Sequence, residues 1–122
     1  MGAEDRMTET SLVRSLLTVA AAFGARWFRN NVGRLRDLTG RYVTYGLCVG
    51  SSDVIGWTPI TIGPEHVGRT LAVFTAFECK VGRNVTTVEQ GAFLAAVKAQ
   101  GGIAAVVRRV EDADAAVEAF CA

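Results

Sequence analysis

The sequence predicts an α/β domain in which helices pack on a mixed β-sheet. Apolar residues recur at helical spacing from Leu12 to Phe23, whereas Thr70–Lys80 and Ile103–Val107 are apolar runs typical of buried strands. The order helix, strands, helix, strand, helix is that of a sheet with helices packed on it. The chain has 122 residues, and 50% of them are hydrophobic, which suffices for one compact core. We therefore expect a single domain over residues 1–122.

The first part of the chain is expected to hold one amphipathic helix and the start of the sheet. After a loose polar leader, residues 1–8, the helical pattern continues to a glycine stop at Gly24. Ala25–Asn31 carries β-type residues and predicts a short extended segment. The glycine-punctuated, basic stretch Val32–Gly40 predicts a loop, and Arg41–Val49 has the composition of a strand.

A Gly-Ser-Ser turn then places Asp53 at the start of a further strand, Val54–Ile62. Within it Pro59 indicates an edge or a bulge, because proline cannot donate a ladder hydrogen bond. Gly63–Gly68 predicts a turn. Thr70–Lys80 is apolar on both alternating faces until its last residues, which predicts a central strand covered on both sides.

The last part of the chain predicts a helix, a buried strand and a final helix. Thr86 stands three residues before Glu89, which is capping-box spacing, and the helix that follows is expected to continue to about Gln100. Two glycines end it. Ile103–Val107 is then expected to form a buried strand, and Asp112–Phe120 a helix.

The charges are unevenly distributed along the chain. The formal net charge is only +1, which indicates no nucleic-acid partner by itself. The segment from residue 14 to residue 41 has a single acid, Asp37, against these arginines: Arg14, Arg26, Arg29, Arg34, Arg36 and Arg41. Such a segment is either a phosphate-binding surface or a solvated, arginine-rich helix and loop, and the charge pattern alone leaves both interpretations open.

Cysteine and histidine usage argues against a zinc site. The chain has three cysteines without CxxC spacing and one histidine, which favours reduced thiols in a cytosolic setting. The apolar stretch Ser15–Phe23 is shorter than the roughly 20 residues that span a membrane, and its acidic leader is unlike a secretory start. We therefore expect a cytoplasmic protein with no membrane partner.

The residues that predict chemistry stand at the end of the long apolar run. Side chains alternate along a strand, so Glu78 and Lys80 should point to one side and Cys79 to the other. If Asp53 begins an adjacent strand, its carboxylate, that of Glu78 and the backbone carbonyl of Cys79 form an oxygen-lined site suited to Mg²⁺. Two such acids repel each other unless a cation lies between them. Glu9, on the inward stripe of the first helix, offers a further carboxylate.

A metal ion held there would polarise a phosphoryl group, and Lys80 would position water or stabilise charge on the phosphate. The simpler interpretation is a surface ion pair between Glu78 and Lys80, with Asp53 as a turn residue. The context favours the site, because the acid–x–lysine triplet ends a long apolar strand, follows an isolated aspartate and precedes a capped helix.

Several sequence motifs in this order resemble the VRR-NUC family of the PD-(D/E)xK nuclease superfamily. The resemblance covers about Glu9 to Arg109. The motifs are FRNNVG (Phe28–Gly33), GSSDVIGW (Gly50–Trp57), FECK (Phe77–Lys80), the helix segment Thr86–Gly102 and AVVRR (Ala105–Arg109). One departure is Ser52, which stands where the superfamily name has a proline. It removes no metal ligand.

The resemblance implies a restriction-endonuclease-like fold and hydrolysis of DNA phosphodiesters with Mg²⁺ or Mn²⁺. It matches Asp53 to the motif aspartate, Glu78 and Lys80 to the ExK pair, Glu9 to a first-helix glutamate and Gln90 to a glutamine near the site. Gln90 has a structural alternative, in which it only caps or braces. Stand-alone members of bacteria and phages resemble Holliday junction resolvases and act on branched DNA as homodimers.

Under this resemblance the basic residues are expected to neutralise phosphates without reading bases. The candidates are Arg26, Arg29, Arg34, Arg36 and Arg83. Asn30 and Asn31 are expected either to touch the DNA backbone or to form a turn. Three other functions stay open: a nicking or flap endonuclease that does not resolve four-way junctions, a non-catalytic DNA-binding module of the same fold, and a structural partner of other phage or host proteins.

Overall fold

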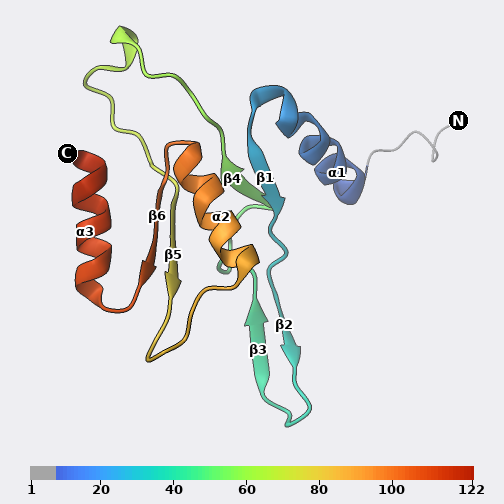
Figure 1. Ribbon diagram of the computed structural model, residues 1–122. Coiled ribbons are helices and arrows are strands. Elements are labelled where there is room, and N and C mark those ends of the chain that lie inside the picture. The colour runs from blue at the N-terminus through green and yellow to red at the C-terminus, as the bar shows by residue number, and fades with distance from the viewer. Residues whose placement is uncertain (1–7) are drawn as a thin grey trace, which may run out of the picture. The chain divides into compact units, whose positions relative to one another are not determined.

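The computed structural model describes residues 8–122, and the chain forms two compact units, Met1–Ile60 and Thr61–Ala122 (Figure 1). Each unit combines helices with strands, so the α/β class is confirmed. Residues 1–7 of the expected leader lie outside the described residues. None of the helices from residue 8 onward is both long and apolar enough to cross a membrane.

The first unit begins with helix α1 (Glu9–Val19), which continues into a 3₁₀ turn, η2 (Ala20–Phe23). Thr8 caps α1, because its hydroxyl accepts a hydrogen bond from the Ser11 amide at 3.0 Å. Val13 and Ala20 are buried. The predicted glycine stop is confirmed: Gly24 has a φ of 66°, and its N–H donates to carbonyls of the last turn.

Strand β1 (Arg26–Arg29) pairs antiparallel with β4 (Val54–Trp57). Trp57 is buried and its ring lies 5.7 Å from that of Phe28, centroid to centroid. The predicted strand Val54–Ile62 is therefore too long by several residues. It ends before Pro59, which lacks the N–H that an extended ladder would require.

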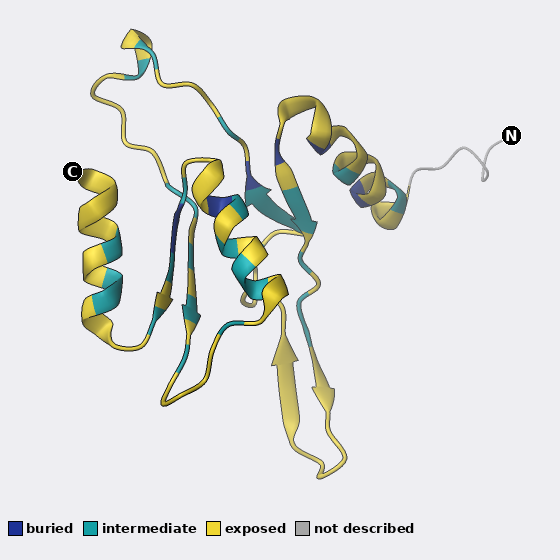
Figure 2. Cartoon of the chain, in the orientation of Figure 1, coloured by how far each residue is buried: buried dark blue, intermediate teal, exposed yellow. Residues whose placement is uncertain are grey.

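Strands β2 (Gly33–Arg36) and β3 (Tyr42–Tyr45) form an antiparallel hairpin, whose residues are almost all exposed (Figure 2). The prediction of a loop at Val32–Gly40 is thus wrong for Gly33–Arg36, whereas residues 37–40 form the turn between the two strands. The hairpin closes at Asp37, whose carboxylate accepts hydrogen bonds from the amides of Thr39 at 2.9 Å and Arg41 at 3.0 Å. This local turn brings the two strands together.

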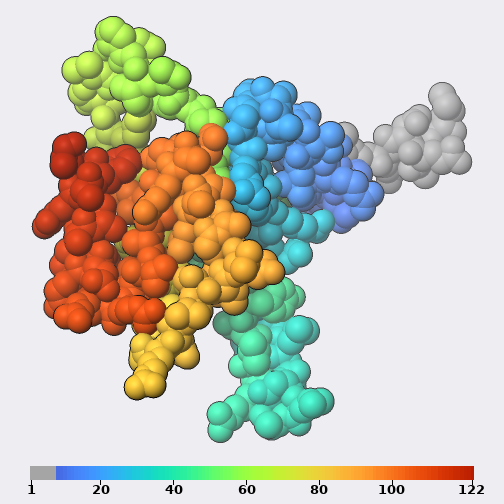
Figure 3. Space-filling view, in the orientation of Figure 1, coloured from blue at the N-terminus to red at the C-terminus, as the bar shows by residue number. Residues whose placement is uncertain are grey.

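In the second unit, β5 (Thr75–Cys79) runs parallel to β6 (Ile103–Val107), and helix α2 (Val88–Ala99) connects them. The space-filling view shows the atoms of α2 in orange (Figure 3). Helices α2 and α3 (Val110–Cys121) both contact β6. The core of this unit holds Val97, which is 1% exposed, with Ile103 and Ala104. A short 3₁₀ turn, η3 (Pro64–His66), lies within the long segment before β5.

Two predictions for this unit need correction. The strand expected at Thr70–Lys80 spans only Thr75–Cys79, and exposed and half-buried residues alternate along it rather than being covered on both faces. Helix α2 contacts β5, and β5 pairs with β6 alone among the described strands, so it is not the central strand that the sequence predicted. All three ladders, β1–β4, β2–β3 and β5–β6, have two strands in the part of the chain described, so the single mixed sheet stays a prediction.

The final helix starts at Val110, two residues earlier than the expected Asp112. Asp112 lies in its first turn and accepts hydrogen bonds from the amides of Arg108 at 2.8 Å and Arg109 at 3.2 Å. These bonds, the one from Arg108 first, hold the pKa of Asp112 below its usual value. Asp112 thus provides the hydrogen-bond acceptor for two backbone amides that precede the helix, although it lies inside the helix rather than at the N-cap position.

Candidate functional site

Glu78 and Lys80 lie together at the end of β5. The Lys80 Nζ is 3.3 Å from the Glu78 Oε1, and the side chains of Lys80 and Glu78 are 16% and 28% exposed respectively. This ion pair agrees with the predicted placement of both side chains on one side of the strand. The Lys80 amide donates to the Val107 carbonyl at 3.1 Å, so β6 holds the backbone of Lys80 just beyond the ladder.

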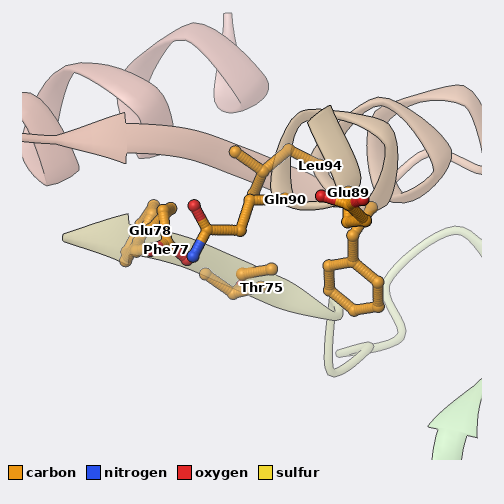
Figure 4. A pocket seen from close by; sticks show the side chains of 8 residues that line it. Thr75, Phe77, Glu78, Glu89, Gln90 and Leu94 are labelled. Carbon is orange, nitrogen blue, oxygen red and sulfur yellow. The ribbon is translucent and has the colours of Figure 1, made fainter. Parts of the chain in front are cut away.

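A hollow of about 490 Å³ lies between β5 and α2 (Figure 4). Figure 4 shows the side chain of Gln90 reaching from α2 toward β5, on the side of Glu78. The residues that line the hollow are Thr75, Ala76, Phe77, Glu78, Glu89, Gln90, Phe93 and Leu94. The second unit therefore brings Glu78, Lys80 and Gln90 of the predicted set into one neighbourhood.

Gln90 also has a structural role at the start of α2. Thr87 is the N-cap, and its hydroxyl accepts a hydrogen bond from the Gln90 amide at 3.1 Å. In return the Gln90 side-chain oxygen accepts one from the Thr87 amide at 2.9 Å. The capping box predicted at Thr86 and Glu89 thus lies one residue later, at Thr87 and Gln90. Glu89 is therefore not part of the cap, and it lines the hollow instead.

The cap predicts different outcomes for two substitutions of Gln90. Gln90→Ala removes the hydrogen bond to Thr87 and is expected to lower the free energy of unfolding by about 0.5–1.5 kcal/mol. Gln90→Glu keeps an acceptor at the same position and should unfold close to wild type. Denaturant unfolding of both variants measures this. Equal stability of Gln90→Ala and wild type would show that the cap contributes nothing.

The loop after Lys80 is held by an arginine from the end of β6. The Arg108 guanidinium donates to the carbonyls of Gly82 at 3.1 Å and Asn84 at 2.7 Å. The planar fork of arginine suits two acceptors at once, which the single ammonium of lysine does not match. Arg108 thus positions the segment between Lys80 and α2.

Asp53 lies in the first unit, exposed, directly before β4, and Asn30 fixes the loop that leads to it. The Asn30 amide donates to the Asp53 carbonyl at 2.7 Å. The Asn30 side chain donates to the Ser51 hydroxyl at 2.7 Å and the Ser52 carbonyl at 2.9 Å, and accepts from the Leu47 amide at 2.9 Å. Of the two roles expected for Asn30, the structure shows the turn-forming one.

Replacing Asn30 by alanine is expected to free this loop and to lower the free energy of unfolding by about 1–3 kcal/mol, because three side-chain hydrogen bonds are removed. Hydrogen exchange gives a local readout, since the Leu47 amide loses its acceptor and should exchange faster. Asn31→Ala is the control: Asn31 is exposed and accepts from the Arg29 side chain at 2.8 Å. Unchanged Leu47 exchange in Asn30→Ala would contradict this role.

Glu9 is the first residue of α1 and is exposed, and its side chain has no hydrogen bond or ion pair with any residue from 8 onward. It belongs to the first unit with Asp53, whereas Glu78 and Lys80 belong to the second. Within neither unit do the described residues gather three His, Cys, Asp or Glu side chains that could hold a metal ion. Each unit thus carries part of the predicted set.

The five predicted phosphate-binding arginines comprise Arg26 and Arg29 on β1, Arg34 and Arg36 on β2, and Arg83 after Lys80, and all five are exposed. The Arg26 guanidinium lies 5.8 Å and 5.7 Å from the ring centroids of Phe28 and Trp57, so it also covers the aromatic core of the first unit. Four of the five lie in the first unit, which gives that unit a positive surface.

Comparisons with known protein families, curated proteins and solved structures find no match. The resemblance to the VRR-NUC family therefore depends on the sequence motifs alone. The function must accordingly be inferred from the protein's own residues and their geometry.

Proposed function

We propose that this protein is a divalent-metal-dependent endonuclease of the VRR-NUC type that hydrolyses phosphodiesters of branched DNA. The observation that carries the proposal is the Glu78–Lys80 pair at the end of β5, held by β6 and placed beside Gln90 at the edge of a hollow. A carboxylate and an ammonium fixed together at a strand end suit phosphoryl chemistry, which needs both a metal ligand and a source of positive charge.

The oxygen donors fit a hard cation such as Mg²⁺ or Mn²⁺. Asp53, Glu78 and the backbone carbonyl of Cys79 are the proposed ligands, and Glu9 is a further carboxylate of the site. Glu78 is only partly exposed, and its one ion-pair partner among the described residues is Lys80, so a bound cation would share this carboxylate with the Lys80 ammonium. When bound, the ion supplies Lewis-acid polarisation of the phosphoryl group.

Lys80 has two tasks in this proposal. Its ammonium orients the attacking water and donates hydrogen bonds to the phosphate oxygens as negative charge develops on them. The ion pair with Glu78 holds the ammonium and the backbone bond to Val107 holds the main chain before DNA arrives, so little reorganisation is needed in the transition state. Gln90, whose oxygen is engaged by Thr87, keeps its amide N–H groups to orient water or phosphate.

The exposed arginines of the first unit would hold the DNA backbone through charge, with Arg83 contributing beside Lys80. A restriction-endonuclease-like arrangement, action as a homodimer and a cytoplasmic location in a bacterial or phage-infected cell complete the proposal. Two symmetric cuts in a four-way junction need two active sites, which is the physical reason for a dimer. Light scattering with and without junction DNA measures this, and a monomer in both would contradict it.

The test of the activity is cleavage of labelled four-way-junction, flap and linear DNA in Mg²⁺, Mn²⁺ or EDTA. We expect cutting of the junction that requires either metal and stops in EDTA. Cutting of flaps or single nicks in linear DNA, with the junction intact, would replace the resolvase assignment by that of a flap or nicking enzyme. If well-folded protein binds all three DNAs and cuts none in any metal, it is a binding module and the proposal fails.

A further inference from the structure

The β2–β3 hairpin presents two chemically different faces. Its register pairs Arg34 with Thr44 and Arg36 with Tyr42. Residues directly opposite each other in an antiparallel ladder point to the same face, so these four side chains share one face. The intervening pair, Leu35 and Val43, belongs to the other face. The Arg34–Arg36–Tyr42–Thr44 side is called the cationic face below.

Both arginines of the cationic face stack on one aromatic ring. The guanidinium carbons of Arg34 and Arg36 lie 4.1 Å and 5.0 Å from the centroid of the Tyr42 ring. Arg36 also donates to the Tyr42 hydroxyl at 3.2 Å. Stacking restricts the rotamers of both side chains, while N–H groups of both guanidinium groups remain without a hydrogen-bond partner among residues 8–122, so less entropy is lost when an anion binds.

The positive charge of this face is not neutralised by an ion pair. Neither Arg34 nor Arg36 has a carboxylate within salt-bridge distance among residues 8–122. The acid of the hairpin, Asp37, is committed to the turn, where the hydrogen bond from the Thr39 hydroxyl lowers its pKa. An anionic partner would therefore meet two guanidinium groups that no carboxylate of residues 8–122 already occupies.

A hollow of about 530 Å³ lies at the base of the hairpin. Its lining includes Arg34 and Thr44 and the loop from Gly46 to Gly50. Gly46 has a φ of 86°, and a Cβ there would collide with the backbone of Val32, so this loop needs glycine to pass close to the strand. The cationic face thus adjoins a concave surface on the segment that leads to Asp53.

We propose that the cationic face is a duplex-binding arm, which grips the phosphate backbone of B-form DNA. This inference rests on the proposed function and extends it to a defined contact. An antiparallel two-stranded ribbon is one of the elements that the major groove admits. Arginine forks bind phosphates bidentately, and the contact selects duplex without reading its sequence.

The test is binding of labelled linear duplex in EDTA, where cleavage cannot occur, across a salt series. The variant is Arg34→Ala/Arg36→Ala, and the matched control is Arg69→Ala/Lys98→Ala, which removes the same charge from exposed positions after η3 and in the last turn of α2. Removing one arginine–phosphate interaction reduces the slope of log K against log salt by about 0.9. We expect the slope of the hairpin variant to fall by about 1.8 per protomer and its affinity to fall at least about tenfold.

The control should keep the wild-type slope. Tyr42→Phe keeps the ring and should bind nearly as wild type, whereas Tyr42→Ala should weaken binding because both arginines lose their stacking partner. Equal losses of affinity in hairpin and control variants would overturn the proposal, since they would indicate general charge rather than a defined arm. The proposal would also be overturned if the hairpin variant kept its DNA affinity but lost binding to phosphatidylserine vesicles. That result would indicate that the cationic face binds a lipid surface.

The outcome is separable from that of the nuclease proposal. A wild-type protein that binds duplex through the hairpin and never cuts DNA supports the arm and rejects the activity. If the wild-type protein cuts DNA, while the hairpin variant has a native circular dichroism spectrum and unchanged DNA affinity, the duplex-binding arm is rejected and the nuclease activity is supported.

Discussion

Lys80→Ala is expected to lower the rate of DNA cleavage by about 10²–10³-fold while leaving DNA affinity within about threefold of wild type. The Lys80 side chain is 16% exposed and its ammonium contacts Glu78, so alanine removes the positive charge from the carboxylate at the end of β5. Nothing nearby on β5 can replace it, because the next side chain on the same strand side is Glu78 itself. The loss should therefore fall on the chemical step rather than on binding.

Lys98→Ala is the matched control for this prediction. Lys98 is exposed in the last turn of α2, so its removal changes the net charge equally without touching the β5 end. Single-turnover cleavage of junction DNA, with affinity measured separately in EDTA, distinguishes the two steps. Wild-type rates in Lys80→Ala, or an equal loss of rate in Lys98→Ala, would remove Lys80 from the catalytic set.

Trp57→Ala is expected to lower the free energy of unfolding by about 3–5 kcal/mol, more than any other substitution proposed above. Trp57 is 8% exposed, its ring packs against that of Phe28, and the Arg26 guanidinium covers it. The first unit has few other buried side chains among its described residues, all of them small. A decrease of this size is a large part of the stability of a small domain.

Trp27→Ala is the comparison for Trp57→Ala. Trp27 is the other tryptophan of the chain, and it is only half-buried, with its ring stacked on Phe23 at 5.6 Å and its N–H donated to the Thr58 hydroxyl. Each variant keeps one tryptophan as a fluorescence probe for denaturant unfolding. A Trp57→Ala variant no less stable than Trp27→Ala would show that the β1–β4 aromatic cluster is not the main core of this unit.

Local sequence patterns predicted where the helices lie, because apolar periodicity and glycine stops are encoded within a few residues. The stop at Gly24 and the strand Ile103–Val107 were placed correctly. The β2 strand was missed because glycine and arginine have low strand preference on their own. Its stability comes from pairing with β3 and from the Asp37 turn, which depend on interactions that a local window does not contain.

The candidate site was likewise predictable from the sequence only in part. The two-residue period of a strand was enough to place Glu78 and Lys80 on one side. Spacing was not enough to identify the capping residues of α2, because Thr86 with Glu89 and Thr87 with Gln90 have identical spacing. Only the backbone geometry selects the second pair. The role of Asn30 could not be read from spacing either, since its partner Ser51 is 21 residues away.

The two hydrogen bonds of the Arg108 guanidinium limit how this region tolerates changes in chain length. One guanidinium reaches two carbonyls, those of Gly82 and Asn84, so the number of residues between them is set by the width of the arginine fork. An insertion or deletion there would separate the acceptors and release the segment that follows Lys80. Beyond Asn84, at the exposed Val85, an extra residue would leave both acceptors in place. Length variation among homologous loops should therefore be confined to the side nearer α2.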